Sequence, residues 1–62
     1  MFMYGREFNE IKIGGLFHLN GNDYEKRSTR TARMLSTGLT FYVGKSELVY
    51  PIAWWEVYVI SS

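Results

Sequence analysis

The clearest structural signal in this chain is the stretch Phe17-His18-Leu19-Asn20-Gly21-Asn22-Asp23-Tyr24. Phe17 and Leu19 alternate with His18, which is the period of a strand with one apolar face. Asn-Gly is a favoured pair at a tight hairpin turn, because both central positions of such a turn require positive φ. The stretch therefore predicts a strand that ends in a tight turn at Asn20-Gly21.

Further turn-forming residues occur on both sides of this turn. The other turn signals are Gly14-Gly15, Ser36-Thr37-Gly38, Gly44-Lys45-Ser46 and Pro51. Short strands separated by such signals are typical of a small all-β barrel or sandwich. We expect strands over residues 11–19, 24–35, 39–43, 48–50 and 54–60, and Pro51 at a strand end because it cannot donate a ladder hydrogen bond. The predicted core is Phe8, Ile11, Ile13, Phe17, Leu19, Leu35, Leu39, Phe41, Val43, Val49, Trp55, Val57 and Val59.

Residues 28–35 fit two structures. As a helix, they would place Lys26, Arg30 and Arg33 on one face at i, i+4 and i+7. As a strand, they would alternate the basic residues between two faces. Thr29 and Thr31 favour a strand, because β-branched residues prefer extended backbone. We therefore predict a strand or a pair of strands over residues 24–35.

The C-terminal segment 54–60 is apolar on both faces of a predicted strand. Trp55, Val57 and Val59 form one face, and the other face is Trp54, Glu56, Tyr58 and Ile60. A strand that is apolar on both sides is usually buried on both sides, whereas a small barrel covers only one. Trp54, Tyr58 and Ile60 are therefore the candidate interface residues. Their cover would be the N-terminal residues 2–4, a protein partner or a second copy of the chain.

The composition limits the function classes. The 62 residues include one histidine and no cysteine, which removes disulfides and thiolate metal sites. We expect a single domain over residues 1–62, with residues 1–7 as an N-terminal arm. We see no secretory signal and no stretch approaching the roughly 20 apolar residues that span a bilayer. These features predict a cytoplasmic protein, because a reducing compartment suits a chain without cysteine.

No group of residues predicts catalysis. His18 is the sole histidine, lies among apolar neighbours, and fits a half-exposed strand position. The six acids have no motif spacing, and Gly44-Lys45-Ser46 is explained by a hairpin turn, because Leu39 stands where a phosphate loop would need glycine. We therefore expect no enzyme, no cofactor, no metal and no small-molecule substrate.

The charge distribution indicates a binding surface. Lys26, Arg27, Arg30 and Arg33 lie within eight residues that contain no acid, whereas the other three cations and six acids give −3. Arginine and lysine neutralise phosphates, and small β-barrels bind single strands by combining a cationic groove with stacking aromatics. Tyr24 and Tyr42 are the stacking candidates, placed on outer faces by alternation. The sequence pI of about 8.1 is below the value above 9 typical of nucleic-acid modules.

Two sets of residues resemble known groups. The run Ile11-Lys12-Ile13-Gly14-Gly15-Leu16-Phe17 resembles the first strand of SH3-like small barrels. A longer pattern is similar to short uncharacterised bacteriophage proteins: residues 8–14, then Phe17, Asn20-Gly21, Lys26, Ser28, Arg30-Thr31-Ala32 and Phe41-Tyr42. The resemblance covers residues 8–50. It implies a compact β-barrel and a phage origin, and it implies no activity.

Together these features predict an all-β, five- or six-stranded SH3-like or OB-like barrel. Its expected role is a non-enzymatic module that binds nucleic acid through Lys26, Arg27, Arg30 and Arg33. One alternative is a module that binds or inhibits a host protein, and the other is a structural subunit that self-associates. We expect no membrane partner. Both alternatives would use the aromatic C-terminal strand.

Overall fold

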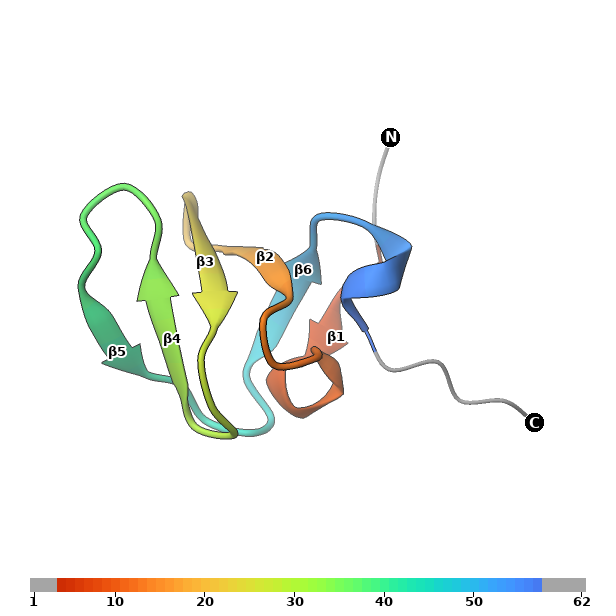
Figure 1. Ribbon diagram of the computed structural model, residues 1–62. Coiled ribbons are helices and arrows are strands. Elements are labelled where there is room, and N and C mark those ends of the chain that lie inside the picture. The colour runs from red at the N-terminus through yellow and green to blue at the C-terminus, as the bar shows by residue number, and fades with distance from the viewer. Residues whose placement is uncertain (1–3, 58–62) are drawn as a thin grey trace.

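The computed structural model describes residues 4–57, except the side chain of Trp54. These residues form one six-stranded antiparallel sheet with the order β1-β6-β2-β3-β4-β5 (Figure 1). The strands are β1 (Arg6–Glu7), β2 (Leu16–Leu19), β3 (Asn22–Lys26), β4 (Thr31–Met34), β5 (Thr40–Tyr42) and β6 (Leu48–Pro51). Two 3-10 helices, η1 (Phe8–Glu10) and η2 (Trp54–Glu56), complete the elements. The predicted all-β class is confirmed. In the described residues β1 and β5 are the two outer strands, and they do not pair with each other.

The hairpin predicted at Asn20-Gly21 is present. Asn20 has a φ of 52° and Gly21 has a φ of 83°, so both turn residues adopt the left-handed conformation. The turn sets the register of β2 against β3, with Leu19 opposite Asn22 and Phe17 opposite Tyr24. Pro51 is the last residue of β6, which also agrees with its expected place at a strand end.

The strand predicted over residues 11–19 is wrong in its first half, because β2 begins only at Leu16. Ile11 forms an isolated bridge with Val57, and Gly14 turns the chain with a φ of 90°. At Gly15 an added Cβ would lie 2.8 Å from the carbonyl oxygens of Lys12 and Glu56. The two glycines therefore interrupt the extended run and allow the chain to bend closely against η2.

The N-terminal arm predicted over residues 1–7 is corrected at its end. Arg6 and Glu7 form β1 and pair with Val49 and Leu48 of β6. A capping box follows at once, because the backbone N–H of Glu7 donates to Glu10 Oε2 at 3.0 Å. This box starts η1, which carries Phe8 into the core.

The basic segment is two strands joined by a turn, and the alternative helix over residues 28–35 does not form. The backbone N–H groups of Arg27 and Ser28 both donate to the carbonyl of Thr31. The hydroxyls of Ser28 and Thr31 are hydrogen-bonded at 2.6 Å. These bonds satisfy the turn locally, so β3 and β4 pair directly, with Lys26 opposite Ala32.

The strand predicted over residues 54–60 is wrong for residues 54–56, which form η2 instead. The chain leaves the sheet after Pro51, and the Glu56 N–H donates to the carbonyl of Ala53. The carbonyl of Glu56 accepts from Lys12 N–H at 2.7 Å, and its Oε1 accepts from Leu16 N–H at 3.2 Å. η2 is thereby fixed to the chain just before β2. Residues 58–60 lie outside the described residues.

The core lies on one face of the sheet, where η1 and the bridge at Ile11 cover it. Its buried hydrophobic residues are Phe8, Ile11, Phe17, Tyr24, Ala32, Val43 and Val49. An aromatic series runs through it. The ring centroids of Phe8 and Phe17 are 5.5 Å apart, those of Phe17 and Tyr24 are 5.6 Å apart, and those of Tyr24 and Phe41 are 6.3 Å apart.

Part of the predicted core is wrong. Ile13, Leu35, Leu39, Phe41 and Trp55 are exposed, whereas Leu19 and Val57 are half-buried against the core. Val59 lies outside the described residues. Leu39 and Phe41 belong to the β5 side of the sheet, where no further described strand covers the apolar face. Tyr24 and Ala32 take the central places that these residues were expected to fill.

Within the part of the chain that the structure describes, no helix has the length and apolar character to cross a membrane.

Candidate nucleic-acid interface

The surface of interest is the outer face of the sheet, defined as the face opposite the core. Strand register brings residues from different strands into rows across this face. One row runs from Glu25 on β3 to Arg33 on β4 and Thr40 on β5. The next row contains Arg27, Thr31 and Tyr42, because Thr31 pairs with Tyr42 and its carbonyl accepts from Arg27 N–H. These rows join basic, hydroxyl and aromatic side chains over β3, β4 and β5.

Two of the predicted basic residues share one carboxylate on this face. Arg27 Nη1 lies 3.4 Å and Arg33 Nη2 lies 3.5 Å from Glu25 Oε1. Both distances are long for charge-assisted hydrogen bonds, which are usually about 2.7–2.9 Å. Arg33 Nε is buried and has no hydrogen-bond partner among the described residues. One acid therefore orients two arginines and leaves part of their donor capacity unused.

Arg30 lies in the turn between β3 and β4 and is exposed. Its backbone N–H donates to Ser28 Oγ, and its carbonyl accepts from Val43 N–H beyond β5. Among residues 4–57 its guanidinium has no carboxylate within ion-pair distance. The turn therefore holds a third, unneutralised arginine at the same end of β4 as Arg27.

Tyr42 is the exposed aromatic residue on the outer face of β3, β4 and β5. It is 89% exposed on β5, opposite Thr31 and diagonal to Arg33. Diagonal neighbours on one face lie within reach of aromatic and long side chains. We refer to Arg27, Arg30, Thr31, Arg33, Thr40 and Tyr42 together as the arginine patch.

Lys26 does not belong to the arginine patch, and its predicted surface position is wrong. The side chain points to the core face, and the residue is 3% exposed. Its Nζ donates to the carbonyl of Phe8 at 2.9 Å and lies 4.5 Å from the centroid of the Phe8 ring. Burial lowers the pKa of this ammonium below its ordinary value of 10.5. Lys26 therefore fixes η1 to the sheet and cannot contact a ligand outside.

Tyr24 was also expected on the outer face, and this placement is wrong. Its ring is buried and stacks on Phe17 with an angle of 12° between the ring planes. Lys26 and Tyr24 are two residues apart on β3, so they share a face. That face is the core face. Phe17 of β2 lies opposite Tyr24, and Ala32 of β4 lies opposite Lys26, because β3 lies between β2 and β4 in the sheet.

The three predicted interface residues are not placed by the structure. The backbone of Trp54 begins η2, but its side chain is not described, and Tyr58 and Ile60 lie outside the described residues.

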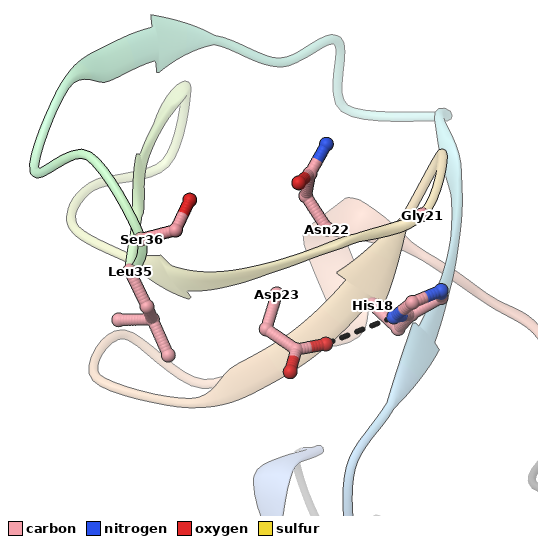
Figure 2. Close-up of a pocket in the computed structure, with 6 residues that line it drawn as sticks. All are labelled: His18, Gly21, Asn22, Asp23, Leu35 and Ser36. Atoms are coloured by element: carbon pink, nitrogen blue, oxygen red, sulfur yellow. Dashed lines mark hydrogen bonds and ion pairs between the residues drawn. The ribbon is translucent and has the colours of Figure 1, made fainter.

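A shallow depression of about 500 Å³ lies beside the turn of the β2–β3 hairpin (Figure 2). It is lined by His18, Gly21, Asn22, Asp23, Leu35 and Ser36. His18 Nδ1 and Asp23 Oδ1 are 2.8 Å apart, and both side chains are about half exposed, as expected for His18. Within residues 4–57 there is no cluster of three or more potential metal ligands. The depression is open to water, so it offers a surface pair rather than a shielded site.

The patch contains two residues, Thr31 and Thr40, that the sequence did not identify as site residues. Thr40 lies opposite Arg33 and presents its side chain to the outer face of β5. Its signal was the alternation of Thr40 and Tyr42 against Phe41. The alternation alone does not place Thr40 beside Arg33, because that contact depends on the pairing of β5 with β4.

Comparisons of this chain with protein-family models, with curated proteins and with solved structures find no match. Function is therefore inferred from the geometry of the described residues.

Proposed function

We propose that this chain is a non-enzymatic binding module that holds a single-stranded nucleic acid across the arginine patch. The observation that carries the proposal is the register of β4 and β5, which sets Tyr42 opposite Thr31 and diagonal to Arg33. Cations that follow a phosphate backbone, together with an aromatic ring on which a base stacks, are the usual elements of single-strand binding. Hydroxyl groups such as those of Thr31 and Thr40 add neutral phosphate contacts.

The arginines of the patch can exchange the Glu25 carboxylate for a phosphate at little cost in free energy. Exposed ion pairs of this kind contribute about 0–1 kcal/mol, so the pairs of Arg27 and Arg33 with Glu25 cost little to replace. A phosphate could take the Nη donors of both guanidinium groups, which belong to side chains that are 53% and 43% exposed. Arg30 brings a further charge without a competing acid among the described residues. Three arginines and Glu25 together carry a net charge of +2, which suits a polyanion.

The open position of the patch supports binding rather than catalysis. The patch lies on the exposed side of a sheet, whereas catalytic sites usually enclose their substrate and exclude water. We also propose the finer features that the sequence suggested: an SH3-like small barrel, a phage origin and a cytoplasmic location. Six short antiparallel strands with one shared core support the first of these.

A salt series with a short fluorescent single-stranded oligonucleotide tests the function. Arg33→Ala should weaken binding and should reduce the slope of log affinity against log salt by roughly 0.7, which is the contribution of one phosphate contact on a single strand. Tyr42→Ala should cost about 1–3 kcal/mol of binding free energy, with less effect on the salt slope, because a stacking contact is lost.

Arg6→Ala is the matched control. It also removes one exposed arginine, but from β1, at the edge of the sheet opposite β5. Binding by the Arg6→Ala protein should stay close to that of the parent. The proposal fails if Arg33→Ala and Arg6→Ala bind with the same affinity and the same salt slope.

A further inference from the structure

The edge strand β5 presents free backbone groups beside the arginine patch. Met34 N–H donates to the carbonyl of Leu39, and Val43 N–H donates to the carbonyl of Arg30. Because hydrogen-bonded residues alternate along an antiparallel strand, Leu39, Phe41 and Val43 turn their backbone groups to β4. The N–H and C=O groups of Thr40 and Tyr42 therefore point to the open side, where no described strand pairs with them.

This edge lacks the usual protection against pairing. Natural edge strands carry charges, proline or a bulge that discourage a second chain from adding. Residues 36–44 contain no charged residue and no proline, whereas the opposite edge strand β1 consists of Arg6 and Glu7. Leu39 is 59% exposed and Phe41 is 41% exposed on the core side of β5. The β5 edge is thus apolar as well as unpaired.

We propose that a second copy of this chain pairs with β5 through its own β5, in antiparallel orientation about a twofold axis. Thr40 would pair with Tyr42 of the second copy, because these are the residues with free backbone groups. Phe41 would then lie opposite Phe41 of the second copy on the core side. No two like charges meet in this register, because the paired residues are all uncharged.

The second copy contributes residues to the binding surface, and this consequence rests on the proposed function. A twofold axis perpendicular to the sheet leaves both outer faces on the same side. The row of Glu25, Arg33 and Thr40 then continues into Tyr42, Thr31 and Arg27 of the second copy. Each Tyr42 ring would have arginines of both copies near it, so one single strand could follow both patches.

The size of the edge indicates that the pairing is weak without ligand. β5 has three residues, whereas stable interfaces bury roughly 1,200–2,000 Å² in total. A strand that occupies both patches would add its own binding energy by raising the effective concentration of the second copy. We therefore expect the dimer to form on nucleic acid and at high protein concentration.

Cysteine crosslinking tests the pairing without any ligand, because the chain has no cysteine of its own. In a pair of this kind the two Cα atoms at position 41 lie about 4.5 Å apart, which is within the range that a disulfide spans. Phe41→Cys should therefore give an oxidised dimer. Leu39→Cys is the matched control on the same face, immediately before β5, because its two copies would lie about 13 Å apart. Faster dimer formation by Leu39→Cys, the more exposed position, would overturn the proposal.

Binding cooperativity tests the same edge with nucleic acid. On an oligonucleotide long enough for two patches, the parent and Leu39→Lys should bind the second copy at least about tenfold more tightly than the first. Leu39 and Phe41 both lie on the core side, outside the arginine patch. Phe41→Lys places two like charges directly opposite each other across the twofold axis, whereas Leu39→Lys places its charge opposite Val43 of the second copy. Phe41→Lys should therefore abolish the cooperativity while a short oligonucleotide still binds.

Cooperativity that persists in Phe41→Lys as it does in Leu39→Lys would contradict the proposed dimer. Failure of the parent to bind the short oligonucleotide would instead contradict the proposed function, and the crosslinking result would still decide the pairing.

Discussion

Lys26 is predicted from the sequence to lie on the surface, but the structure buries it in the core. It is a member of the basic run, yet its ammonium lies over the Phe8 ring and donates to the Phe8 carbonyl. That carbonyl also accepts from Ile11 N–H at 3.1 Å, so it keeps a partner if Lys26 is replaced. The structure pairs this buried cation with no carboxylate among the described residues. Its charge is therefore a cost to folding that the surrounding contacts offset.

This arrangement predicts a pH dependence of stability. The pKa of Lys26 is lowered in the folded protein from its ordinary value of 10.5, so the unfolded chain binds more protons as pH rises toward that value. The free energy of unfolding contributed by Lys26 should therefore increase with pH over the window between its lowered pKa and 10.5. Denaturant unfolding of the parent and of Lys26→Met at several pH values measures this.

Lys26→Met is the reference, because both proteins contain the other titrating groups and the contributions of those groups to the pH dependence cancel in the difference. The stability of the parent relative to Lys26→Met should rise as pH increases through that window. A difference that stays flat or falls would show that the ammonium is not held at a desolvation cost.

At the scale of elements, the β2–β3 hairpin depends on its turn. Asn20 and Gly21 both have positive φ, and only then does Leu19 come opposite Asn22. A slip of one residue would move Phe17 to the outer face, because side chains alternate along a strand. The hairpin turn thus selects which residues of β2 and β3 enter the core.

The cost of this turn can be isolated with two alanine substitutions. Gly21→Ala should lower the free energy of unfolding by about 1–2 kcal/mol, because an L-residue is strained in the left-handed conformation. Gly44→Ala is a matched control, since an added Cβ meets nothing within 4 Å at either glycine and only Gly21 has a positive φ. Equal stability of the two variants in thermal or urea unfolding would contradict the assigned role of Gly21.

At the scale of the whole molecule, stability depends on one apolar layer on one face of the sheet. Phe17 is fully buried at its centre and contacts both Phe8 and Tyr24. A chain of this size has a total stability of about 3–9 kcal/mol, at roughly 0.05–0.15 kcal/mol per residue. Loss of a single core ring is therefore comparable with the stability of the entire fold.

Phe17→Ala should cost about 3–5 kcal/mol and leave much of the chain unfolded at room temperature. Tyr42→Ala, which removes an aromatic ring of the outer face, should change stability by no more than about 0.5 kcal/mol. Circular dichroism melts of the two variants would separate these cases. A folded Phe17→Ala protein with a parent-like melting temperature would mean that the core does not depend on the aromatic series.

Sequence alone was sufficient for what local backbone chemistry controls. It predicted the all-β class, the turn at Asn20-Gly21 and the approximate places of β5 and β6. The strand that it favoured over residues 24–35 also divided the basic residues between two faces. These features follow from φ preferences and from the two-residue period of a strand, which act over a few neighbours.

Tertiary structure decided everything that depends on contacts between distant segments. Alternation says that Lys26 and Arg27 point to opposite sides, but only the packing of Phe8 and Phe17 against β3 decides which side is the core. Likewise, Tyr42 joins the arginines only through the pairing of β5 with β4. The apolar segment after Pro51 read as a strand, yet η2 forms there, because Glu56 bonds to Lys12 and Leu16, some 40 residues earlier in the chain. Such contacts are set by the free energy of the whole fold, which no local pattern contains.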